Sequence, residues 1–169
     1  AVNRYFHDIF FPPFEVLRPI PPLAWVPASI VFWPTTELSI AFVTFLGAFF
    51  TIVINVLGGA RSIDIRYLRA AQSMGATQWD LFRKIILPGT LPSIFTGAAV
   101  GMGITWEVVL AGEMISGGGQ QGGGGLGFFI WSSYMGGTVA QVIVGMISIG
   151  SAGYLSSSLI RYIGSIAMP

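Results

Sequence analysis

The stretch "LSIAFVTFLGAFFTIVINVL" (38–57) holds 20 consecutive residues without a charge. About 20 apolar residues in a helix are enough to cross the ~30 Å hydrocarbon core of a bilayer. Because a single spanning segment satisfies all its backbone groups only as a helix, we expect a transmembrane α-helix here. The whole chain agrees with this setting, since 53% of its residues are hydrophobic and 9% are charged, against roughly 25% charged in soluble domains.

Three further segments have the composition of membrane spans. Residues 138–160 carry no charge, and residues 91–115 are apolar apart from two glutamates. Residues 16–33 are apolar but contain four prolines, so we expect this span to be kinked or partly unwound. The sequence therefore predicts an all-α membrane protein, one domain over residues 1–169 with about four spanning helices.

The positions of the cations predict how the chain is oriented. Five of the eight Lys and Arg residues lie between positions 61 and 84, and an excess of Lys and Arg is typical of cytoplasmic loops. We therefore place the loop 58–88 and the C-terminus in the cytoplasm, and residues 116–137 outside. Residues 126–135 are too short to span and rich in aromatic side chains, which favours a helix lying at the outer interface.

The cytoplasmic loop has the pattern of two short helices with a break between them. Residues Ile63–Met74 are compatible with a helix that Gly75 can end with a positive φ. Thr77 is a candidate N-cap, and Asp80 three residues later suits both a capping box and the positive end of the helix dipole.

An apolar stripe is predicted on the second of these helices. It consists of Trp79, Phe82, Ile85 and Ile86, and we expect Pro88 and Pro92 to stop the helix and open the next span. On these residues alone, two interpretations stay open: the stripe docks into a groove on a partner, or it lies on the membrane or under the spans.

The sequence of this loop resembles the cytoplasmic signature of ABC importer permeases. That signature begins with Glu-Ala-Ala. After three residues comes Gly, and after nine further residues comes Ile-x-Leu-Pro. Six residues here are in register: Ala70, Ala71, Gly75, Ile85, Leu87 and Pro88. Arg69 departs from the signature, since it stands where the family usually has Glu. The segments "LRPIPPLAWVP" (17–27), "GEMISGG" (112–118) and "LGFFIW" (126–131) are similar to permeases of nitrate, sulfonate, taurine and bicarbonate importers.

This resemblance implies a type I ABC importer fold with a pathway between two permease copies, which are identical or paralogous. It also implies two separate ATPase subunits, an external substrate-binding protein and a further span at the N-terminus. The loop would then couple the pathway to the ATPase. The residues expected to do so are Arg69, Ala70, Ala71, Gly75, Ala76, Trp79, Phe82, Ile85, Leu87 and Pro88.

The chain has no G-x-x-x-x-G-K-[ST] motif to cradle phosphates, so ATP and Mg are expected on a partner subunit and no cofactor on this chain. The glycine-rich segment 117–127 lacks the lysine of such a motif. It is predicted to be an external loop, either merely flexible or a surface that meets the binding protein.

Glutamates within a membrane span suggest function, because an ionisable group there is costly. For Glu107 two interpretations stay open, a position facing the pathway or a buried polar partner. We expect Glu113 to accept hydrogen bonds from the adjacent glycine-rich loop. The broken helix around Pro21, Pro22 and Trp25 would line the pathway or be simply kinked, and Trp106 is a further candidate for pathway or gate.

Small residues are expected to let the spans pack closely, at Gly97 and Gly101 and at Gly150, Gly153 and Ser157. Other function classes are less well supported. The only histidine is His7 and there is no cysteine, which leaves no evident nucleophile, thiolate metal site or disulfide. A net charge of +1 argues against a nucleic-acid partner.

The sequence thus predicts a non-catalytic permease subunit that imports a small anion by alternating access, with a passive channel or a membrane anchor as the alternative. It does not choose among nitrate, bicarbonate, taurine or another sulfonate.

Overall fold

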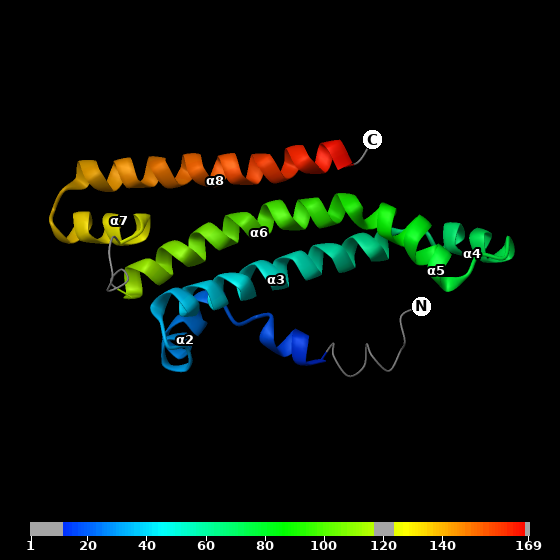
Figure 1. The fold of residues 1–169 in the computed structure, drawn as a ribbon, viewed down its shortest axis with the longest axis horizontal. Coiled ribbons are helices and arrows are strands. Elements are labelled where there is room, and N and C mark those ends of the chain that lie inside the picture. Colours follow the sequence, from blue (N-terminus) through cyan, green and yellow to red (C-terminus); the bar gives the residue numbers. More distant parts are fainter. Residues whose placement is uncertain (1–11, 117–123, 168–169) are drawn as a thin grey trace.

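The computed structural model describes residues 12–116 and 124–167, and the regular structure in these ranges is helical. Three helices are long and apolar enough to cross a membrane: α3 (Thr36–Ser62), a helix from Gln78 to Ile115, and α8 (Val139–Ala167). Most of the second of these is α6 (Leu87–Ser116). Figure 1 shows the three running side by side along the long axis of the molecule.

Short helices lie at the two ends of this bundle. At one end are α4 (Ile65–Ser73) and α5 (Gln78–Leu81), which join α3 to α6. At the other end are α2 (Val26–Phe32) and α7 (Leu126–Met135), the latter confirming a short helix after the glycine-rich segment. Figure 1 shows that α4 and α5 project beyond the end of α3, away from α7.

The first predicted span is confirmed and is longer than its uncharged stretch. Helix α3 begins after Thr35, whose side chain accepts a hydrogen bond from the Leu38 amide at 3.3 Å. Glu37 in its first turn and Arg61 in its last turn both match the helix dipole. The helix therefore continues to Ser62, and the loop predicted at 58–88 starts five residues later than expected.

Glycines allow α3 and α6 to approach closely, as predicted for Gly97 and Gly101. A Cβ atom on Gly97 would lie 2.7 Å from the Asn55 Cβ, and one on Gly59 would overlap the Ser93 side chain. Toward the α7 end, a small core forms where Val43 of α3 and Val108 of α6 meet Val26 of α2. These two helices form the frame on which the other elements are placed.

The span predicted at 16–33 is wrong. Residues 12–17 are helical, a turn follows, and the chain then forms the 3-10 helix η1 (Pro22–Trp25) and the seven-residue α2. A proline lacks an amide donor and cannot sit inside a helix without disrupting it, but it fits a first turn. Both η1 and α2 accordingly have proline in their first turn, so this segment consists of short pieces and does not span.

The prediction that Pro88 and Pro92 stop the second loop helix is also wrong. Helix α5 continues through a π-helical segment, η2 (Phe82–Ile86), directly into α6, which contains Pro92. In η2 the Leu87 amide donates to the Phe82 carbonyl five residues earlier. This wider turn moves the carbonyls away from the ring of Pro88, so the helix passes the proline without ending.

Helix α8 packs along its length on one side only, where buried or half-buried positions recur every three or four residues from Val142 to Gly164. Gly164 lies against Phe95 of α6 and Gly145 against Ile130 of α7. A Cβ atom on Gly150 would meet nothing within 4 Å among the described residues, so the packing role predicted for Gly150 is wrong within this chain. The last predicted span, 138–160, is longer than expected and ends at Ala167. The expectations for an N-terminal span and for residues 117–123 lie outside the described residues.

Candidate functional site

The loop between α3 and α6 is a tight elbow built from two capped helices. Helix α4 starts at Asp64, whose carboxylate accepts from the Arg66 amide at 2.8 Å. The helix ends at Met74, and Gly75 follows with a φ of +84°. The turn is closed by the Ala76 amide, which donates to the Ala71 carbonyl at 3.0 Å. The break predicted at Gly75 is therefore confirmed.

The capping box predicted at Thr77 is present. The Asp80 amide donates to the Thr77 Oγ1, the Thr77 amide donates to Asp80 Oδ2, and each distance is 3.2 Å. Lys84 Nζ lies 2.8 Å from Asp80 Oδ1. Hydrogen bonds from Lys84 and then from Thr77 lower the pKa of Asp80 to about 2. The carboxylate is thus ionised at neutral pH and fixes the start of α5.

Two buried side chains hold the elbow together. Ala71 of α4 and Leu81 of α5 are buried, whereas Ala70 is exposed and Ala76 is half-buried. Arg69 is exposed, and its carbonyl accepts from the Ser73 hydroxyl at 3.0 Å. The small side chain of Ala71 therefore lets α4 and α5 lie close together, while the side chain of Arg69 remains at the surface.

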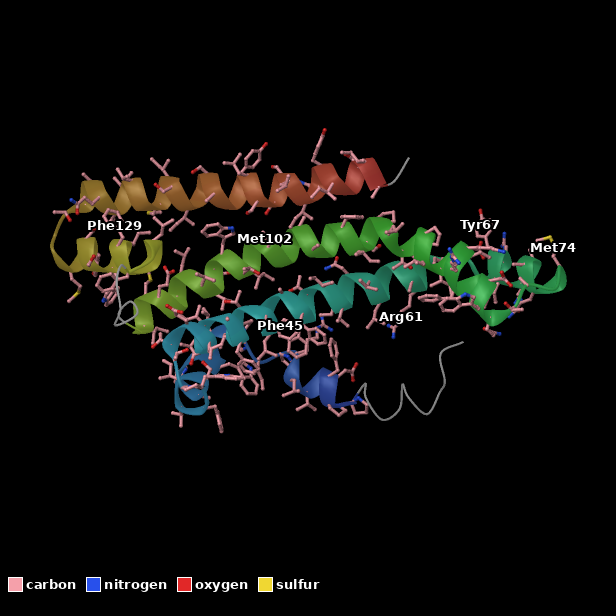
Figure 2. The ribbon with its side chains drawn as sticks, viewed as in Figure 1. Phe45, Arg61, Tyr67, Met74, Met102 and Phe129 are labelled. Carbon is pink, nitrogen blue, oxygen red and sulfur yellow. The ribbon has the colours of Figure 1, made fainter. Side chains whose placement is uncertain are left out.

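Large apolar side chains project from this elbow. Trp79 is 67% exposed and Phe82 is 45% exposed, and their rings stack with centroids 5.7 Å apart. Tyr67 and Met74 are 68% and 82% exposed and project from the far end of the molecule in Figure 2. Clustered exposed apolar side chains of this kind mark a surface that meets a protein partner or the membrane. Tyr67 and Met74 were missed by the sequence analysis, although their spacing of seven residues places them on one side of α4.

The predicted apolar stripe is divided by the π-helical segment. Trp79 and Phe82 are exposed, while Ile85 and Ile86 are half-buried, so the four do not form one surface. Leu87 and Pro88 are exposed at the start of α6. The signature residues thus fall into two groups, one in the elbow and one in the connection that leads from the elbow into α6.

The segment around η1 packs into the groove between α3 and α6. Pro22 would be 3.3 Å from a Cβ atom on Gly47, Pro21 is exposed, and Trp25 packs half-buried against the valine core. A hollow of about 330 Å³ beside it is lined by Trp25, Ala28, Ser29, Phe32, Trp33 and Phe42. Its lining is almost wholly apolar and holds no cation, so it is not suited to an anion.

The structure separates the other candidate pathway residues. Trp106 faces α8, where its Nε1 donates to the Ser156 hydroxyl at 3.0 Å. Glu107 is exposed, and no hydrogen bond or ion pair to it is found in residues 12–116 and 124–167. Glu113 faces α7, and its Oε2 accepts from the Gly127 amide at 2.8 Å. The acceptor role expected of Glu113 is thus seen at the first turn of α7, where a carboxylate also suits the helix dipole.

Comparison with known proteins gives this arrangement a family. The family described as binding-protein-dependent transport system inner membrane component matches residues 1–166. The chain belongs to this family. The nitrate import permease protein NrtB of Leptolyngbya laminosa is 37% identical over 158 residues, which are 94% of this chain and 55% of NrtB.

Two other relatives of this permease component have different named substrates. The bicarbonate transport system permease protein CmpB of Synechococcus elongatus is 33% identical over 163 residues, 96% of this chain and 57% of CmpB. The taurine transport system permease protein TauC of Escherichia coli is 35% identical over 125 residues, 74% of this chain and 44% of TauC. The chain spans about half the length of the curated relatives it matches. It belongs among the inner membrane components of binding-protein-dependent transport systems.

Proposed function

We propose that this chain forms part of the pathway of an ATP-driven importer for a small anion and couples that pathway to a separate ATPase. Nitrate, bicarbonate, taurine and other sulfonates are the substrates considered, by analogy with what the relatives are named for. The partners would be ABC ATPase subunits that hold ATP and Mg, a second permease copy, an external binding protein and the bilayer. The elbow and the C-terminus would face the cytoplasm.

One observation carries this proposal: the exposed elbow continues directly into a membrane helix. Residues Gln78–Ile115 form a helix of 38 residues, which includes Trp79 and Phe82 at one end and Glu113 near the other. Because the helix is not interrupted at Pro88, a displacement of α5 by a partner moves α6 with it. Closure of the ATPase subunits would in this way rock the spans between inward-open and outward-open states.

The test is ATP hydrolysis by the complex purified through a tag on this chain, comparing Trp79→Asp with the matched control Gln78→Asp. Both variants add a carboxylate to α5 at adjacent exposed positions, but only the first removes the ring stacked on Phe82. Loss of a central aromatic contact costs about 2 kcal/mol or more of binding free energy. We therefore expect the ATPase activity that co-purifies with Trp79→Asp to be at least about tenfold lower than with wild type.

Gln78→Asp should retain wild-type ATPase activity and its stimulation by the binding protein. If the wild-type chain brings no ATPase with it, or if both variants behave like wild type, the coupling proposal is wrong. A passive channel or a membrane anchor would then be the better description.

A further inference from the structure

Two sides of helix α6 pack on other helices, and a third side is not covered by residues 12–116 or 124–167. Gly97 and Gly101 face α3, and Trp106 faces α8. The third face consists of Thr96, Val100, Gly103 and Glu107, which recur at intervals of four, three and four residues and are all exposed. A Cβ atom on Gly103 would meet nothing within 4 Å among the described residues.

Glu107 lies well inside the membrane span. Three residues earlier, Ile104 packs against Gly47, which is near the middle of α3. One residue later, Val108 is buried against Val43. A carboxylate at this depth is costly in hydrocarbon, so this face of α6 does not lie against lipid tails and requires water or polar groups around it.

An opposite charge lies at a similar depth on another segment. Arg18 is exposed in the turn that precedes η1. On one side of it, the Phe14 ring lies 5.0 Å from that of Phe50, and on the other side Pro22 lies against Gly47. Both contacts are with the middle of α3, so Arg18 is at membrane depth as well. Exposed charges of both signs are therefore present where lipid would exclude them.

We propose that the uncovered face of α6 lines the translocation pathway and that Glu107 selects a substrate carrying an ammonium group, so that the transported small acid is a zwitterion. This inference rests on the proposed function and narrows its substrate class. In a pathway of reduced dielectric, the Glu107 carboxylate repels a simple oxyanion and attracts an ammonium group. The guanidinium of Arg18 suits the sulfonate or carboxylate end of the same molecule.

These 169 residues contain no cysteine, so within them a single introduced cysteine reports on a single position. Gly103→Cys places a thiol four residues before Glu107, on the same face of α6. Gly150→Cys on α8 is the matched control, because a side chain there is equally unobstructed but its helix has no acidic residue. Each is made in the complete transporter in membranes. Each then reacts with two methanethiosulfonates of similar size, one ending in trimethylammonium and one in sulfonate.

We expect Gly103→Cys to react with both reagents and Gly150→Cys, facing lipid, to react with neither. The cationic reagent should be faster at Gly103→Cys, and adding Glu107→Gln should lower the ratio of the two rates at least about fivefold, as unit charges one helical turn apart allow. A Gly103→Cys thiol as inert as that of Gly150→Cys would overturn the pathway assignment.

Reaction at Gly103→Cys without a charge preference, or with one that survives Glu107→Gln, would overturn the substrate class and leave the pathway intact. The substrate class would also be overturned if the complete transporter carried nitrate or bicarbonate and Glu107→Gln left the transport rate unchanged. The thiol reaction rates do not depend on the elbow, so their failure is distinguishable from failure of the coupling proposal.

Discussion

At the scale of single residues, Gly75 decides the shape of the elbow between α4 and α5. Its φ of +84° lies in the region that residues with a side chain rarely adopt, and a Cβ atom there would meet nothing within 4 Å. The requirement for glycine is therefore one of backbone strain and not of space. Its neighbours do not share this requirement, since no described residue other than glycine has a positive φ.

We expect Gly75→Ala to destabilise the protein by about 1–2 kcal/mol through left-handed backbone strain. Gly75→Asn should cost clearly less, because asparagine tolerates this conformation far better. Thermal unfolding of the purified protein in detergent measures both. Equal losses for the two variants would show that space at this position, and not φ, is what matters.

At the scale of elements, α5 is too short to be stable by itself. It has four residues, and a helix of this length gains little from its own hydrogen bonds. The capping box of Thr77 and Asp80, the ion pair with Lys84 and the buried Leu81 fix it from outside. Its role as the first turn of a 38-residue helix therefore depends on a few polar contacts at its start.

These contacts predict a definite pH dependence. The pKa of Asp80 falls from 3.8 to about 2 on folding, so its contribution to stability is fully present above pH 3.8 and is lost as the pH falls through 2. We expect the difference in unfolding temperature between wild type and Asp80→Asn to be constant from neutral pH down to mild acid. It should then shrink toward pH 2. With Lys84→Met, the folded-state pKa of Asp80 lies closer to 3.8, so the loss should be smaller and complete at a higher pH. An unchanged profile would contradict the role of the ion pair.

At the scale of the whole molecule, α3 and α6 form the closest pair of helices, and α8 packs on α6 and α7 along one side. The close approach at Gly59, Gly97 and Gly101 leaves no room for side chains between α3 and α6. Helix α8 meets α6 through Phe95 against Gly164, through the Trp106 to Ser156 hydrogen bond and through the Ser157 hydroxyl, which donates to the Ala99 carbonyl. A movement of α5 therefore passes first to the α3 and α6 pair.

Adjacent glycines test this packing. Gly59→Ala would place a Cβ atom in the Ser93 side chain, whereas Gly58→Ala meets nothing within 4 Å. We expect Gly59→Ala to destabilise by about 1–3 kcal/mol through overpacking. Gly58→Ala should be neutral or slightly stabilising, because alanine favours the helix. Thermal unfolding in detergent compares them, and a Gly59→Ala protein as stable as Gly58→Ala would show that the two helices are not in close contact.

Several features could be predicted because they depend on neighbours in sequence. The uncharged stretch 38–57, the break at Gly75 and the capping box at Thr77 each follow from local chemistry within a few residues, and the structure has all three. The close packing at Gly97 was predictable for the same reason, since small residues spaced by four lie on one side of a helix. Local hydrogen bonding and apolar length thus determined the membrane class, the first span and the elbow.

Other features were decided only by contacts between distant segments. The prolines from 19 to 27 divide one expected span into short helices seated on α3 and α6. Pro88 does not end the helix, because a π-helical turn precedes it, and α6 also continues through Pro92. Glu107 and Glu113 are alike in sequence, yet one is left uncovered and the other binds the start of α7. The sequence by itself determined that the chain crosses a membrane and where its elbow bends, because these depend on local free energies. Which residues are covered, and which remain available to a partner or a substrate, depends on how the helices pack, and only the tertiary structure decided it.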